Sequence, residues 1–110
     1  MALTVYGLKN CDTCKKALAA LTAAGETIHF VDIRAEAELA TKVPEWLAAA
    51  DVEVLVNKRS TTWRTLSDAE READPEALLI AYPTLVKRPV IETGEAVFVG
   101  WSKATQAALT

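Results

Sequence analysis

The order strand, helix, strand over residues 3–32 is the feature that most limits how this chain can fold. Residues 3–6 form a short strand-like run, and Gly7 with Asn10 supplies turn residues after it. Apolar side chains then recur at helical spacing over about three turns. Residues 27–32 alternate as in a second strand. Two strands joined in this way run parallel with a right-handed crossover, so the sequence predicts a βαβ unit.

Helices are predicted in the middle of the chain. Residues 34–50 are rich in Ala, Glu and Leu, and Pro44 suits the first position of a short helix. A basic polar loop is expected over residues 57–64. Ser67 has the position of the first residue in a capping box, and Pro75 suits the start of a further helix.

A hairpin and a last helix complete the pattern. Residues 90–92 and 96–99 flank a turn, and Ser102 is placed to cap a helix that runs to the end of the sequence. The element order is therefore βαβ, helices, ββα. A four-stranded mixed sheet with helices on both faces accommodates this order.

Size and composition indicate one soluble domain. The chain has 110 residues, of which 51% are hydrophobic and 25% charged, which excludes a disordered chain. A formal net charge of -3 disfavours direct nucleic-acid binding. The longest apolar stretch, residues 77–82, is far shorter than the roughly 20 residues of a membrane span. We expect a cytoplasmic protein without membrane contact.

The two cysteines are the strongest chemical signal. Cys11 and Cys14 form a Cys-x-x-Cys motif between the first strand and the first helix, the setting of a redox motif. The helix N-terminus and the nearby Lys15 and Lys16 favour a thiolate, so Cys11 is predicted as the nucleophile. Cys14 lies one turn further along and is the predicted resolving thiol.

Two other interpretations of the cysteine pair are a metal half-site and idle surface thiols. His29 is the only histidine, so four nitrogen and sulfur ligands cannot be assembled within one chain. No metal and no tightly bound cofactor are predicted.

Basic residues in three segments suggest an anion-binding pocket. The residues are Lys9, Lys15, Lys16, Lys58, Arg59, Arg64, Lys87 and Arg88. If the segments meet near Cys11, they would bind an anionic substrate or the carboxylates of glutathione. Ordinary solvated charge is the alternative for residues 57–64. The three tryptophans are expected to be packing residues.

Four segments in this order resemble the ArsC/Spx family, and its YffB-like branch in particular: residues 5–17, 57–64, 87–90 and 99–102. The resemblance implies an α/β, thioredoxin-like fold in a single domain over residues 1–110, with a helical insertion at about 35–82. It also implies that Cys11 is the nucleophile, that Arg88 binds the anion, and that Pro89 is a cis-proline facing the cysteine.

The resemblance implies a thiol-dependent reductase with glutathione as co-substrate. Cys11 and Cys14 would carry the exchange, and the substrate would be bound by Lys9, Asn10, Arg59, Arg88 and Pro89. One alternative is an Spx-like redox-sensing regulator that binds the RNA polymerase alpha subunit. Another is arsenate reduction, for which the family uses three arginines. Here Arg88 matches one of them, and Asn57 and Gly100 stand at the other two positions.

Overall fold

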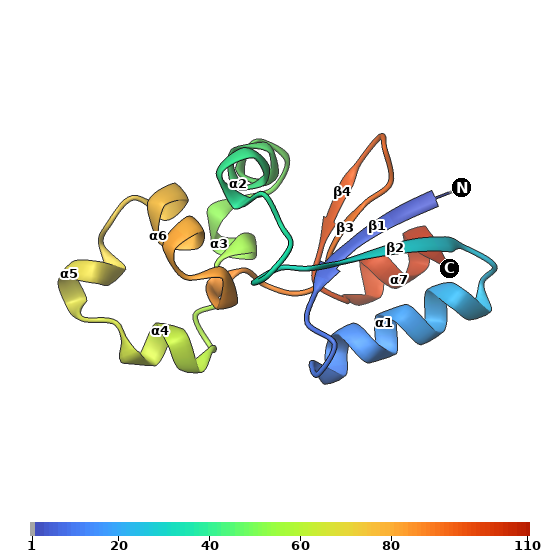
Figure 1. Cartoon of the computed structure of the whole chain (residues 1–110), viewed down its shortest axis with the longest axis horizontal. Coiled ribbons are helices and arrows are strands. Elements are labelled where there is room, and N and C mark those ends of the chain that lie inside the picture. The colour runs from blue at the N-terminus through green and yellow to red at the C-terminus, as the bar shows by residue number, and fades with distance from the viewer. Residues whose placement is uncertain (1) are drawn as a thin grey trace. The chain divides into compact units, whose positions relative to one another are not determined.

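The computed structural model describes residues 2–110 (Figure 1). Its helices and strands are β1 (Ala2–Gly7), α1 (Asp12–Ala23), β2 (Thr27–Asp32), α2 (Leu39–Ala49), α3 (Val52–Leu55), α4 (Thr61–Thr65), α5 (Asp68–Arg71), α6 (Pro75–Ala81), the 3-10 helix η1 (Pro83–Leu85), β3 (Val90–Glu92), β4 (Val97–Val99) and α7 (Lys103–Leu109). The chain divides into two compact units. The first comprises the residues up to Ala37 and those from Arg88 onward, and the second comprises residues 38–87.

The first unit is built on a mixed sheet with strand order β2-β1-β3-β4. Strand β1 pairs in parallel with β2 and antiparallel with β3, and β3 forms a hairpin with β4. Val5 lies opposite Phe30 on one side and Ile91 on the other, as the predicted alternation requires. The predicted α/β class, the four-stranded mixed sheet and the thioredoxin-like fold are therefore confirmed.

The core of the first unit lies on one face of this sheet. Leu3, Val5 and Ile91 project from the strands and pack with Leu21 of α1. Trp101 and Leu109, which lie before and within α7, pack against the same cluster. Both helices of this unit thus cover one face of the sheet (Figure 1). The expectation of helices on both faces is not met within this unit.

The second unit is helical, and its first helix corrects one prediction. Pro44 lies inside α2 rather than at its start, because the helix begins at Leu39. An interior proline removes the N–H that would bond the carbonyl of Ala40. Pro44 and Ala40 are both exposed, so water can hydrate that carbonyl, while Val43 and Trp46 are fully buried on the opposite side. Burial of these two side chains favours the helix despite the proline.

The middle of the chain contains more short helices than the sequence predicts. The expected loop at residues 57–64 contains the start of α4, whose N-cap Ser60 accepts a hydrogen bond from the Trp63 backbone. The predicted capping box of Ser67 and Glu70 is confirmed at α5. Single-turn helices lack the long apolar periodicity that identifies a helix in a sequence.

The second unit overlaps most of the helical insertion that the family resemblance implies. The second unit covers residues 38–87, whereas the sequence analysis placed the helical insertion at about 35–82. The single-domain organisation stays a prediction. None of the helices within residues 2–110 is long and apolar enough to cross a membrane.

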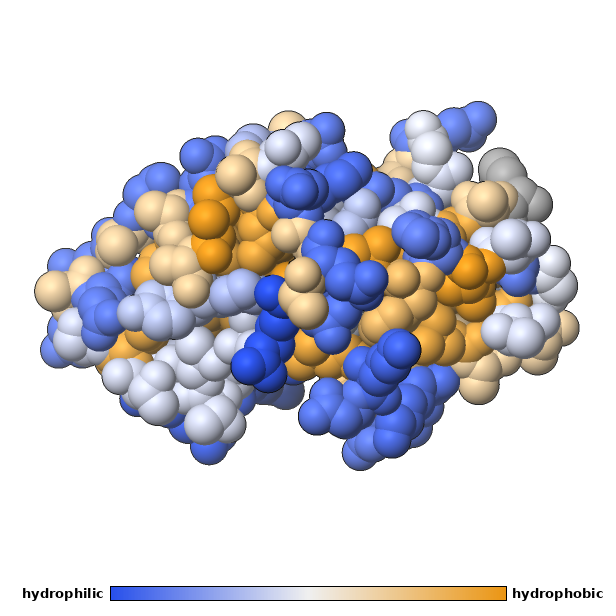
Figure 2. All heavy atoms as spheres, viewed as in Figure 1, coloured by the Kyte–Doolittle hydropathy of each residue, from blue (hydrophilic) through white to orange (hydrophobic). Residues whose placement is uncertain are grey.

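Hydrophobic residues are visible among hydrophilic residues on the face of the molecule that Figure 2 shows. Within the described chain, Val54 of α3 is the large hydrophobic side chain that is exposed, with 45% of its surface accessible. Val5, in contrast, is 0% accessible. The pair offers a matched comparison of one residue type in and outside the core.

We expect Val5→Ala to lower the free energy of unfolding by about 2–3 kcal/mol, because it removes buried methyl groups and leaves a cavity. Val54→Ala should change it by less than about 0.5 kcal/mol. Urea unfolding followed by circular dichroism measures both values. Equal losses in the two variants would contradict the core described above.

Candidate functional site

Cys11 lies at the N-cap of α1. Its backbone is extended, with φ -90° and ψ 122°, and its carbonyl accepts the hydrogen bond from Lys15 N at 3.0 Å. Cys11 N donates to the carbonyl of Leu8 at 3.1 Å, which closes the turn between β1 and the helix. The thiol is half-buried. The N–H groups of the first helical turn lack helical partners, so this position favours a negatively charged sulfur.

The environment of Cys11 stabilises its thiolate. Burial is the largest single influence and raises the pKa of Cys11, but hydrogen bonds from the Cys14 backbone and from the Arg88 side chain act against it. A hydrogen bond from the Cys14 side chain and the positive charge of Arg88 lower the pKa further, so that the net shift is downward. The cation that acts here is Arg88, whereas the sequence analysis named Lys15 and Lys16.

The environment of Cys14 has the opposite effect and stabilises its protonated thiol. Its side chain is 0% accessible, and burial is the main cause that raises the pKa of Cys14 to about 11. The negative charge of Cys11 raises it as well, while a hydrogen bond from the Leu8 backbone and the charge of Arg88 lower it. Cys14 is therefore a protonated thiol at neutral pH. The two cysteines of the motif are held in different protonation states by their surroundings.

Gly7 leaves the space in which the Cys14 thiol lies. A Cβ atom on Gly7 would meet Cys14 Sγ at 2.5 Å, which is closer than real Cβ contacts come. The same atom would lie 3.7 Å from Cε1 of Phe30. Gly7 is the last residue of β1, not a turn residue as expected. Its small size allows β1 and the first turn of α1 to pack closely together.

Arg88 and Pro89 directly precede β3. The peptide bond between them is cis, as the family resemblance implies. Pro89 is buried, and its carbonyl accepts a hydrogen bond from Gly100 N at 2.8 Å. The structure thus brings Arg88 to Cys11 and fixes the segment that carries it to the turn after β4.

An open hollow of about 460 Å³ lies beside this site, where β1 and β2 end. It is lined by Leu8, Lys9, Asn10, Asp32, Arg34 and Ala35. Oδ1 of Asp32 accepts hydrogen bonds from the backbone N–H groups of Arg34 and Ala35 at 2.8 and 2.9 Å, which holds the loop after β2. Parallel strands end at the same edge of a sheet, and this edge is where α/β folds bind ligands.

The predicted site residues are distributed over both units. Cys11, Cys14 and Arg88 interact directly. Lys9 and Asn10, which directly precede Cys11 in the sequence, line the hollow. Arg59 belongs to the second unit, and its role stays a prediction.

Several residues of this region are not among the predicted site residues. Gly7 and Leu8 contact Cys14, and Asp32 and Arg34 shape the hollow. Asp32 and Arg34 could have been found, because they end and follow a strand predicted to lie parallel to β1. Within residues 2–110, no group of three His, Cys, Asp or Glu side chains is arranged to hold a metal ion.

Comparison with known proteins identifies the family. The sequence model of the ArsC family matches residues 6–109. The chain belongs to the ArsC family. It is 37% identical to an uncharacterised protein of Haemophilus influenzae, over 96% of this chain and 97% of that protein.

Solved structures of similar proteins share the fold. A YffB protein is 32% identical, with a TM-score of 0.89 over 97% of both chains. An arsenate reductase (ArsC) related protein from Brucella melitensis is 36% identical, with a TM-score of 0.74 over 98% of this chain and 93% of that one. These alignments span both units of the ArsC-family chain.

We expect Arg88→Gln to raise the pKa of Cys11, because it removes a hydrogen bond and a positive charge from the thiolate. The pH at which alkylation by iodoacetamide reaches half its maximal rate should move upward. Cys14 does not interfere below about pH 9, since its pKa is about 11. Lys103→Gln, which removes one charge from the first turn of α7, is the control. An unchanged profile in Arg88→Gln would refute the role of Arg88.

We expect Gly7→Ala to lower the free energy of unfolding by about 1–3 kcal/mol, because the new Cβ overlaps Cys14 Sγ. The loss should shrink in the background of Cys14→Ala, which removes that sulfur. A double-mutant cycle by urea unfolding measures the coupling. If Gly7→Ala costs the same in both backgrounds, the contact is not the reason for glycine at this position.

Proposed function

We propose that this ArsC-family protein is a glutathione-dependent thiol-disulfide reductase with Cys11 as its nucleophile. The observation that carries the proposal is the position of Cys11, half-buried at the N-cap of α1 and hydrogen-bonded by the Cys14 backbone and Arg88, beside a fully buried Cys14. These contacts lower the pKa of Cys11, whereas burial raises that of Cys14. A thiolate, not a thiol, attacks a disulfide. Membership of the ArsC family and the similarity to a reductase-related protein of Brucella melitensis support the same reaction class.

The reaction has two exchange steps. Sγ of Cys11 attacks the glutathione sulfur of a mixed disulfide, and the substrate thiolate leaves and takes up a proton from water. Cys11 is then joined to glutathione by a disulfide bond. A second glutathione thiolate attacks the glutathione sulfur of this bond, releases oxidised glutathione and restores the Cys11 thiolate. Over the two steps, the mixed disulfide and one glutathione become the free substrate thiol and oxidised glutathione, so the disulfide bond broken in the substrate is replaced by the one formed in oxidised glutathione.

Glutathione resolves the intermediate in this proposal, and Cys14 does not. With a pKa of about 11, Cys14 is ionised to roughly one part in 10⁴ at pH 7, whereas an ordinary thiol is ionised to a few per cent. The charge of Cys11 disappears in the mixed disulfide, but burial remains, and burial is the largest cause of the shift. Cys14 instead supports the thiolate by hydrogen bonds from its backbone and its side chain.

The hollow beside the site suits the anionic part of such a substrate. Lys9 and Arg34 bring two cations to it, and Asn10 adds an amide. The carboxylate of Asp32 is engaged by two backbone N–H groups. Glutathione carries two carboxylates, which these cations would orient while its sulfur reacts at Cys11.

Turnover with glutathione and a small mixed disulfide tests the proposal, with oxidised glutathione measured by a coupled reductase assay. Cys11→Ser should reduce the rate to that of free glutathione, because a hydroxyl does not replace the thiolate. Cys14→Ala should keep activity within about threefold, because glutathione resolves the intermediate.

Two results would overturn parts of the proposal. A wild-type rate no faster than that of free glutathione would reject the enzymatic function. Loss of turnover in a folded Cys14→Ala variant, with an intermediate trapped on Cys11, would assign the resolving step to Cys14.

A further inference from the structure

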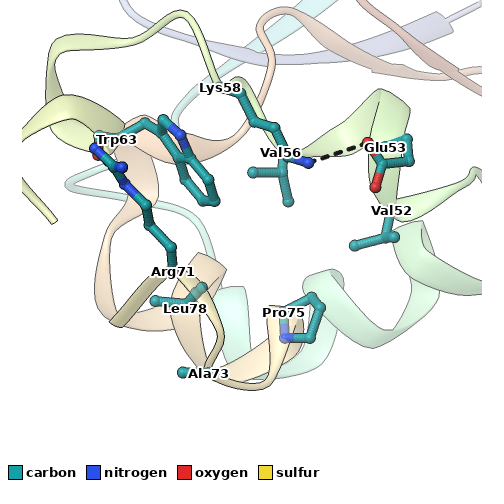
Figure 3. Close-up of a pocket in the computed structure, with 9 residues that line it drawn as sticks. All are labelled: Val52, Glu53, Val56, Lys58, Trp63, Arg71, Ala73, Pro75 and Leu78. Carbon is teal, nitrogen blue, oxygen red and sulfur yellow. Dashed lines mark hydrogen bonds and ion pairs between the residues drawn. The ribbon is translucent and has the colours of Figure 1, made fainter. Parts of the chain in front are cut away.

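The second unit contains a pocket that the redox site does not use. It lies among α3, α4, α5 and α6, has a volume of about 130 Å³, and all of its lining residues belong to residues 38–87 (Figure 3). The open centre of the pocket is surrounded by Trp63, Val56, Val52, Pro75 and Leu78. We propose that this pocket binds a small aromatic carboxylate.

The size and the walls of the pocket fit one aromatic ring. An engineered cavity of about 150 Å³ with apolar walls binds benzene, which is close to the volume found here. The walls are two valines, a proline, a leucine and the indole ring. An aromatic ring placed against Trp63 gains the energy of ring packing in addition to burial. The apolar part of the ligand therefore has about the size of benzene.

The indole ring is held in place without a ligand. Nε and Nη2 of Arg71 both donate to the carbonyl of Trp63 at 3.2 Å, and the guanidinium lies 5.5 Å from the ring centroid. The backbone N–H of Trp63 donates to Oγ of Ser60 at 3.1 Å. The hydrogen bonds fix the backbone of Trp63, and the cation at its ring favours one ring position before a ligand binds, which reduces the entropy cost of binding.

The charge at the pocket favours an anionic ligand. Nζ of Lys58 lies 5.7 Å from the Trp63 ring centroid and forms an ion pair with Oε2 of Glu53 at 3.2 Å. Glu53 accepts one of the three hydrogen bonds that an ammonium group donates. A carboxylate on the bound ring would accept another while the ring contacts Trp63. Among the residues that line the pocket, Lys58 and Arg71 bring two cations against the one carboxylate of Glu53. The carboxylate that pairs with Arg71 Nη1 at 3.8 Å is that of Asp68, which is fully exposed and does not line the pocket.

The pocket also accounts for residues that the proposed function leaves aside. Lys58 and Trp63 belong to the segment at residues 57–64, which the sequence analysis treated as a basic loop with a packing tryptophan. In the structure these two side chains and Arg71 form a cation-ring-cation arrangement at one pocket. This inference is independent of the chemistry at Cys11.

Benzoate is the probe, and binding is followed by two-dimensional NMR of the whole chain. We expect saturable shifts at the Trp63 indole N–H and at the methyl groups of Val56 and Leu78, with a dissociation constant on the order of 1 mM. Benzyl alcohol, which lacks the charge, should bind at least about threefold more weakly. Lys58→Gln should weaken benzoate binding by a similar factor.

A pair of alanine variants tests the location. Ala73→Leu, at an exposed residue that lines the pocket, should fill it and weaken benzoate binding at least about tenfold. Ala77→Leu, at an exposed residue of α6 that does not line it, should leave binding within about twofold. Absence of saturable shifts, shifts centred on other residues, or unchanged affinity in Ala73→Leu would each overturn the proposal. If Ala73→Leu fails to fold, equal binding of benzoate and benzyl alcohol in the wild type would still overturn it.

Discussion

The antiparallel pairing of β1 with β3 is the constraint on which the candidate site depends. Tyr6 lies opposite Val90, so the residues after β1 and the residues before β3 meet at one edge of the sheet. The turn to Cys11 leaves β1 at this edge, and Arg88 enters β3 there. A charge that lies far away in the sequence thereby reaches the thiolate. Without this register, Cys11 would keep the helix terminus and the hydrogen bonds from Cys14 but would lose the positive charge of Arg88.

Burial separates the chemistry of the two cysteines. Both belong to one short motif, yet Cys14 points into the contact between β1 and α1, whereas Cys11 stays half-buried at the helix N-cap. The close approach over Gly7 removes water from the Cys14 thiol and keeps it protonated. Its backbone N–H and its side chain then serve the neighbouring thiolate. Cys14 thus stabilises the thiolate of Cys11 through hydrogen bonds.

The helical unit is organised around different contacts. Trp46 is fully buried in α2, while Trp63 stands between two cations at a small pocket. Interior packing in α2 and the proposed binding pocket at α4 therefore use the same residue type within one unit. A tryptophan in a sequence indicates only that a large apolar ring is present. The side chains that surround the ring in the folded structure determine which of these roles it has.

Elements in both units were predictable from the sequence, because their signals are local. Alternation defined β2 and the cysteine motif marked the start of α1 in the first unit, and Ser67 with Glu70 defined a capping box in the second. Tertiary structure alone decided that Pro44 lies within a helix, that Arg88 rather than Lys15 acts on Cys11, and that Asp32 and Arg34 border the hollow. These outcomes depend on which strands pair and which side chains lose water, and neither property is encoded by the spacing of residues along the chain.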